Sequence, residues 1–192
     1  MKPSGRRPHS NAPATDLQVM MVTTHVAMGL LLAVPIAVVT PAYAAVAAVG
    51  AIIGGILPDI DLFVGQHRRS LHYPTYYSVG AVIMAGVAMG VGDPVVVAAA
   101  VALGAAGLHS ITDWLGAGDE LRPWERTSPR GVYLHVRRRW LRPRYLIRYD
   151  GAPEDLMLTV VCAAPAMVVY DGQIRAVIAV GLVIAMLYTL VR

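Results

Sequence analysis

Charged residues and cysteines are scarce in this sequence of 192 residues. Only 15% of the residues are Asp, Glu, Lys or Arg and 56% are hydrophobic. A soluble domain carries about 25% charged residues, so the deficit predicts lipid rather than water around much of the surface. The single cysteine, Cys162, excludes an intrachain disulfide and a cysteine-based zinc site. We expect Cys162 to be a small buried hydrophobic residue.

Six apolar segments follow a polar beginning. Residues 1–18 are rich in polar residues and Pro, and we expect a disordered polar tail there. Residues 19–192 are expected to form a single membrane domain. A membrane-spanning helix needs about 20 apolar residues, with a range of about 17–25. The predicted fold is therefore an all-α, multi-pass helical bundle with about six transmembrane helices, and four is the alternative count. The segments are 19–39, 42–57, 75–91, 94–108, 156–170 and 174–191.

Two pairs of glycines are spaced one helical turn apart within these segments. Gly50 and Gly54 form the first pair, and Gly86 and Gly90 form the second. Small residues at this spacing let neighbouring helix backbones approach closely in a bilayer. Both pairs are therefore candidate helix-packing positions, although ordinary glycine abundance is an alternative explanation.

Basic residues are distributed very unevenly between the two predicted sides of the membrane. If six segments alternate in direction, Arg175 lies on one side and the other fifteen of the 16 Lys and Arg residues lie on the opposite side. Loops rich in Lys and Arg are retained in the cytoplasm. We therefore expect an inner (cell) membrane protein with both termini and the loops 58–74 and 109–155 on the cytoplasmic side.

Metal-binding side chains gather on this same predicted side. His109 and Asp113 are four residues apart and share a helix face, while Asp59 and Asp61 follow Pro58 at a helix end. Taken alone, each Asp is more typical of a cap or turn, and each His of a polar interface. Their convergence on one side favours a metal centre. The predicted ligands are His25, Asp59, Asp61, His67, His72, His109 and Asp113.

The type of these ligands indicates which metals fit, and their number indicates how many ions are bound. Mixed nitrogen and oxygen ligands suit Zn²⁺, with Mn²⁺ or Fe²⁺ as alternatives. A catalytic zinc ion uses about three protein ligands and keeps one open position. Seven candidates are therefore too many for one such ion, and they suit a dinuclear centre with a shared carboxylate.

The motifs, taken in order, resemble those of the YdjM-type membrane-bound metal-dependent hydrolases (domain of unknown function 457). This resemblance implies a multi-pass helical membrane protein with a catalytic metal site, whose substrates are poorly defined. The chain departs from the family at His72-Tyr73, where the family often has His-Ser. The motifs read Thr24-His25-Val26-Ala27-Met28-Gly29, Pro58-Asp59-Ile60-Asp61, His67-Arg68 with the later His72, and His109-Ser110-Ile111-Thr112-Asp113.

The predicted function is a membrane-bound metal-dependent hydrolase. A metal-activated water would attack an ester, and we favour the phosphoester of a lipid. Arg68 would stabilise negative charge on phosphate oxygens, and Glu120 is a candidate for moving the proton. A metal-ion transporter is the main alternative, although transporters place their ligands near the bilayer midplane. A noncatalytic membrane protein stabilised by its metal is a second alternative.

The segment 121–149 lies in a predicted insertion, 119–155, between the fourth and fifth helices. It contains nine arginines interleaved with aromatic residues, including Trp140 and Tyr145. We expect a β-hairpin or an amphipathic element that binds anionic lipid headgroups. Arginine with aromatic residues also suits nucleic acid, but the nearby bilayer makes lipid phosphate the expected partner. Glu154 and Asp155 are expected to complement the dipole of the fifth helix.

Overall fold

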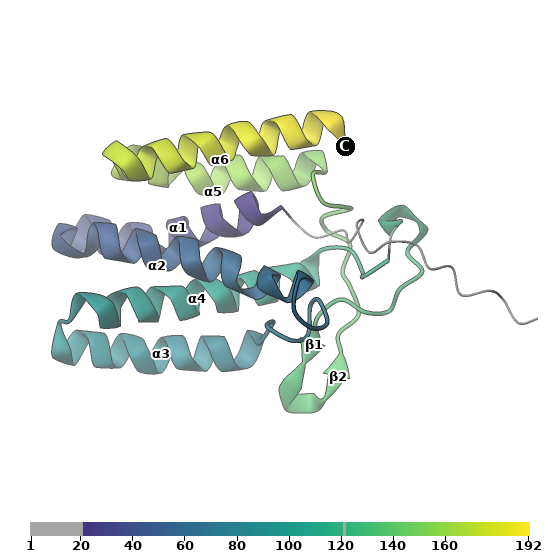
Figure 1. The fold of residues 1–192 in the computed structure, drawn as a ribbon, viewed down its shortest axis with the longest axis horizontal. Helices are drawn as coiled ribbons and strands as arrows, with labels where there is room; N and C mark the ends of the chain where they lie inside the picture. The colour runs from purple at the N-terminus through teal and green to yellow at the C-terminus, as the bar shows by residue number, and fades with distance from the viewer. Residues whose placement is uncertain (1–20, 121) are drawn as a thin grey trace, which may run out of the picture.

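The protein is an α-helical bundle with its helices stacked side by side (Figure 1). The computed structural model describes residues 21–120 and 122–192, so the predicted tail over residues 1–18 lies outside the described part. Helices dominate the structure, as predicted, with 72% of the described residues helical. The helices are α1 (Val22–Val39), α2 (Ala44–Ile56), α3 (Pro74–Val91), α4 (Pro94–Leu115), α5 (Pro153–Val169) and α6 (Gly172–Val191).

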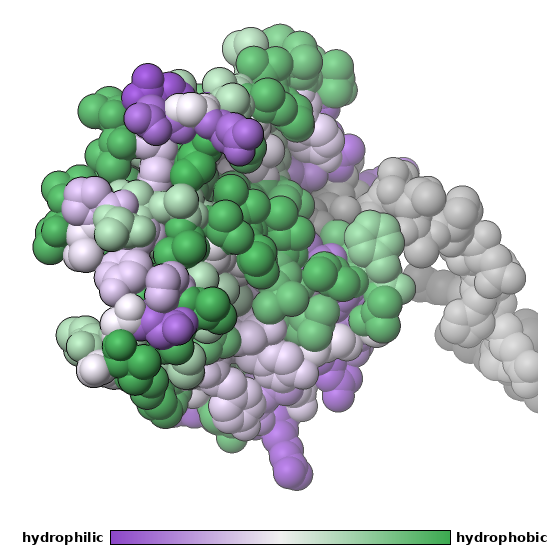
Figure 2. Space-filling model, turned by 60° about the vertical axis from the view of Figure 1, so that its left-hand side comes forward, coloured by the Kyte–Doolittle hydropathy of each residue, from purple (hydrophilic) through white to green (hydrophobic). Residues whose placement is uncertain are grey.

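Five of these helical segments are long and apolar enough to cross a membrane. They are α1, α2 extended by its flanking turns, α3, α4 and α6. The fifth helix, α5, has 17 residues and two acidic residues in its first turn. Figure 2 shows the molecule turned so that the left-hand side of Figure 1 comes forward, and apolar and weakly polar residues cover most of that face.

Helix α4 continues beyond the apolar segment 94–108 and includes His109 and Asp113, which were predicted to share a helix face. Ser110 and Thr112 donate their hydroxyl protons to the carbonyls of Ala106 and Leu108, one turn back. Such bonds satisfy polar side chains within a helix, so the helix ends only at Leu115. His109 and Asp113 therefore lie inside the last two turns of α4.

Close helix contacts in the middle of the bundle depend on one of the two predicted glycine pairs. A Cβ atom at Gly50 or Gly54 would lie 2.3 or 2.1 Å from a backbone oxygen of α4. Gly55 also lies against the backbone of α1, where a Cβ atom would be 2.9 Å from Cα of Val26. The prediction for Gly86 and Gly90 was wrong, because no described atom lies within 4 Å of a Cβ atom at either position.

A largely irregular segment covers one end of the bundle, the right-hand end in Figure 1. We call it the cap (residues 116–120 and 122–150) and this end the capped end. The predicted hairpin is present here, with β1 (Tyr133–Leu134) antiparallel to β2 (Arg139–Trp140). Backbone bonds fasten the cap to α4, since Leu146 N–H donates to the carbonyl of Leu115, and Tyr145 N–H to that of Gly116.

Candidate metal centre

All seven predicted ligand residues lie at the capped end, and all seven are buried. They come from four parts of the chain that lie far apart in sequence. Helix α1 supplies one residue, the short helix η2 (Leu57–Leu62) supplies two, the loop before α3 supplies two and α4 supplies two. In that order they are His25, Asp59, Asp61, His67, His72, His109 and Asp113.

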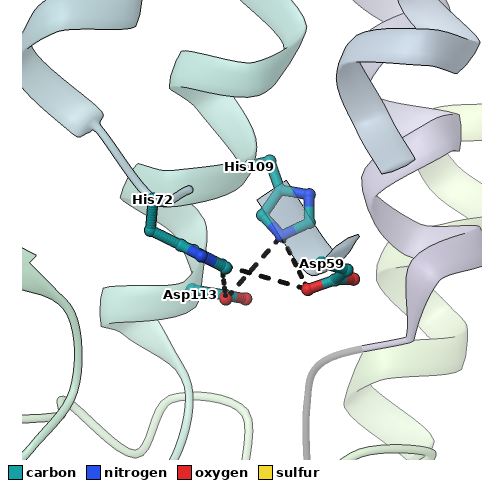
Figure 3. A group of neighbouring side chains, drawn as sticks. All are labelled: Asp59, His72, His109 and Asp113. Carbon is teal, nitrogen blue, oxygen red and sulfur yellow. Dashed lines mark hydrogen bonds and ion pairs between the residues drawn. The ribbon is translucent and has the colours of Figure 1, made fainter. Parts of the chain in front are cut away.

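Four of these residues form a compact group (Figure 3). Asp59, His72, His109 and Asp113 each offer one ligand atom, and these atoms lie within 4.8 Å of one another. The Nε2 atom of His109 is 3.2 Å from Oδ1 of Asp59. The Nε2 atom of His72 is 3.0 Å from Oδ2 of Asp113.

His25 joins this group from α1. Its Nε2 atom is 3.0 Å from Oδ1 of Asp113, and its ring stacks on that of His109 with 3.6 Å between centroids. Five residues therefore direct nitrogen or oxygen atoms toward one small volume. We call these five the centre.

The imidazoles of the centre are oriented by bonds on their far side. Nδ1 of His109 donates to the carbonyl of Gly55 at 2.8 Å. Nδ1 of His72 donates to Asp61 at 2.9 Å. Nδ1 of His25 lies 3.4 Å from the Thr112 hydroxyl, whose proton is directed to the carbonyls of α4. His25 and His109 are thereby held in the tautomer in which Nε2 carries the lone pair that a metal requires. Nε2 of His72 instead donates to Asp113, so its proton must leave before this atom can bind a metal.

Asp61 lies beside the centre and forms hydrogen bonds with three residues of the loop before α3. One carboxylate oxygen accepts from Nδ1 of His67 at 2.8 Å, and the other accepts from Nδ1 of His72 and from the amide of Leu71. Asp61, His67 and His72 also form a second group close enough to hold an ion. Since both oxygens of Asp61 already accept hydrogen bonds, the geometry favours a positioning role for this residue.

Unpartnered polar atoms mark the centre as a cation site. Within the described residues, Nε2 of His25, Nε2 of His109, both carboxylate oxygens of Asp59 and Oδ1 of Asp113 are buried without a hydrogen-bond partner. Buried polar atoms are normally paired, and leaving one unpaired costs about 1–3 kcal/mol. So many acceptors pointing at one volume fit a divalent metal ion.

The electrostatic potential at the centre also favours a cation. Burial alone would lower the pKa of His72, but bonds to Asp113 and Asp61 outweigh it and raise the pKa to about 9. Because the charged form of His72 is favoured despite burial, its surroundings must carry a strongly negative potential.

Arg68 and Glu120, the predicted catalytic residues, lie in different surroundings. Arg68 is buried, with Nε 3.7 Å from Oδ2 of Asp113, and its guanidinium donates to the carbonyl of Ala117 in the cap. Glu120 accepts a hydrogen bond from the hydroxyl of Tyr145 at 2.9 Å, within the cap. The structure therefore brings Arg68, but not Glu120, against a residue of the centre.

A polar network that was not predicted from the sequence lies behind the centre. Asp155 was expected only to complement a helix dipole, yet its carboxylate is completely buried and accepts from Met21 N, Thr24 Oγ1 and Gly151 N. The Thr24 hydroxyl also lies 2.6 Å from that of Thr159. This network ties the first turn of α1, which carries His25, to α5. The sequence feature that could have indicated this network is Thr24, a polar residue directly before His25.

No family model, curated protein or solved structure matches this chain. The resemblance to the YdjM-type hydrolases therefore depends on the motifs alone.

Proposed function

We propose that this protein is a membrane-bound metal-dependent hydrolase that cleaves an ester, most specifically the phosphoester of a membrane lipid. The observation that carries the proposal is the centre itself. Asp59, His72, His109 and Asp113 come within 4.8 Å of one another and His25 contacts Asp113, and four of these five buried residues, all but His72, carry unpartnered nitrogen or oxygen atoms. Zinc is the ion that we favour for this donor set, because three imidazoles and two carboxylates match its preferences.

A bound divalent ion would supply Lewis-acid activation of water and of the phosphoryl oxygen. The chain's own groups supply the rest. His25, His72 and His109 are held with Nε2 directed inward, so little reorganisation is needed to bind. Arg68 presents a fixed positive charge beside Asp113, where it can stabilise negative charge on a phosphate group.

Asp59 is the best-placed proton acceptor for a water molecule in the centre. Both of its carboxylate oxygens are buried and have no described hydrogen-bond partner, so one oxygen can bind an ion while the other accepts a proton. Glu120 is better interpreted as a residue that orders the cap through Tyr145.

We further propose that all six helices cross the membrane, with α5 as the shortest span. Both termini and the centre would then lie on the cytoplasmic side, as the distribution of Lys and Arg predicts. The arginines of the cap would contact anionic headgroups there. Several are exposed beside aromatic rings, such as Arg130 over Trp140 at 5.7 Å.

Metal analysis of the purified protein tests this proposal first. We expect bound zinc in the wild type and its loss in His109→Ala. His135→Ala is the matched control, because His135 lies in the cap and stacks near Tyr73 rather than binding the centre. Equal metal content in wild type and His109→Ala would remove the basis of the proposal.

Activity and transport assays then separate the candidate functions. Hydrolysis of phospholipids that is lost in His109→Ala supports the hydrolase. Metal flux into proteoliposomes without any hydrolysis would favour a transporter. If metal loss lowered only the melting temperature, with neither flux nor hydrolysis in the wild type, the ion would be structural.

A further inference from the structure

The cap is fastened to the loop that carries His67 and His72. Val132 in the cap is fully buried, and its neighbour Tyr133 donates its amide proton to the carbonyl of Arg68. The Arg68 guanidinium in turn donates to the carbonyl of Ala117. The residues of the centre are themselves almost completely buried, so a substrate needs a route between elements of the bundle.

An apolar groove lies on the lipid-facing side of the bundle, between α1, α2, α5 and α6. It has a volume of about 220 Å³, and its walls are almost entirely apolar. Some wall residues, including Val180 and Ile184, are about half exposed, so the groove opens at the surface of the bundle. Residues from each of the four helices line it, among them Val22, Ile52, Ala163 and Gly181.

The groove ends next to the centre. Ile56, the last residue of α2, lines the groove and is followed three residues later by Asp59. Asp59 is 4% exposed, whereas the other four residues of the centre are exposed by 1% or less. Val22, near the start of α1, also lines the groove and lies three residues before His25. The groove therefore reaches the ends of α1 and α2 next to which His25 and Asp59 lie.

We propose that the groove binds an acyl chain of a membrane phospholipid whose headgroup reaches the centre past Ile56 and Asp59. This inference rests on the proposed function and gives it a substrate class, a diacyl phospholipid that arrives sideways from the bilayer. An acyl chain fits because the groove opens between helices of the bundle and its surface is almost entirely apolar, with Thr23 and Thr159 as the polar residues in its lining. Entry from the bilayer also explains how a lipid substrate can reach a buried centre.

Glycine substitutions give a direct test. A Cβ atom at Gly181 would meet no described atom within 4 Å, so Gly181→Leu extends into the groove without a backbone clash. Gly86→Leu is the matched control, because Gly86 is equally unobstructed and lies on α3, away from the groove. Both variants are expected to fold and to bind metal like the wild type.

The first measurement is photolabelling, which requires no turnover. The wild type in vesicles of phosphatidylglycerol that carries a diazirine on one acyl chain is expected to be labelled within residues 177–184 of α6. Gly181→Leu should reduce that labelling about tenfold, and Gly86→Leu should leave it unchanged. Labelling that is spread evenly over exposed α3 and α6, or equal in both variants, would overturn the acyl-chain site.

The second measurement is hydrolysis, which separates this inference from the proposed function. Gly181→Leu should slow the hydrolysis of dipalmitoyl phosphatidylglycerol about tenfold and leave that of water-soluble dihexanoyl phosphatidylglycerol unchanged. Equal loss on both lipids would contradict the groove. If the wild type hydrolyses neither lipid but is labelled in the groove, the proposed function fails while the lipid site stands.

Discussion

Replacing Gly54 with alanine should separate two of the elements that build the centre. Gly54 lies in the last turn of α2, and a Cβ atom there would be 2.1 Å from the carbonyl oxygen of Ala102 and 2.8 Å from Cβ of Ala105. Ordinary contact begins at 3.4 Å, so α2 and α4 would have to move apart by roughly 1 Å, because close-packed interiors transmit such strain.

This displacement affects both stability and metal binding. Overpacking of this kind costs about 1–3 kcal/mol, partly offset by the roughly 0.5–1 kcal/mol that alanine gains over glycine in a helix. Asp59 follows α2, whereas His109 and Asp113 lie on α4. Metal–ligand distances tolerate only about 0.2 Å. Gly54→Ala should therefore weaken zinc binding far more than its modest loss of stability suggests.

Gly90→Ala provides the comparison, since a Cβ atom at Gly90 meets no described atom. This control keeps the gain in helix propensity without the clash, so it should melt at or slightly above the wild-type temperature and keep its zinc. Thermal unfolding in detergent and a zinc titration measure the two effects. If Gly54→Ala matched Gly90→Ala in both, the close contact of α2 with α4 would not position the centre.

Three further predictions concern carboxylates around the centre. Asp61→Asn retains one acceptor oxygen, so it should lower zinc affinity by about 10–100-fold in a titration while the number of ions bound at saturation stays the same. Asp155→Ala leaves the Thr24 hydroxyl and two amides without their acceptor and should destabilise the protein by about 3 kcal/mol in thermal unfolding. Asp150 has a pKa of about 6 in the folded protein against 3.8 ordinarily. Its stabilising contribution is therefore complete below about pH 4 and is lost as the pH rises through 6; unfolding at several pH values should show a drop of up to about 3 kcal/mol that Asp150→Asn removes.

The sequence predicted which residues gather, because that outcome depends mainly on the order of apolar segments. A chain that alternates direction brings the end of α2, the start of α3 and the end of α4 to one side of the bundle. His72 and His109 follow from this alternation alone. The shared helix face of His109 and Asp113 was also predicted, and the hydroxyl bonds of Ser110 and Thr112 let this polar stretch remain helical.

The sequence could not predict the separate roles of these residues. Asp59 and Asp61 are equivalent in sequence, two residues apart after a proline. The 3₁₀ turn of η2 directs Asp59 toward His109 and Asp61 toward His67 and His72. Asp155 contacts Thr24 across 131 residues, a pairing that no local pattern encodes.

The charges buried at the capped end bear on how many ions the protein binds. Asp59, Asp61 and Asp113 contribute three buried carboxylates, Asp155 behind the centre contributes a fourth, and Arg68 is the buried positive charge beside them. Burying uncompensated charge is costly, so this surplus of carboxylates favours a bound cation. A second ion at Asp61, His67 and His72 would displace the N–H groups from which Asp61 accepts hydrogen bonds. Hydrogen bonding therefore favours one ion, bound by some of the five residues of the centre with a position left open for water, over the dinuclear arrangement that the number of candidate ligands first indicated.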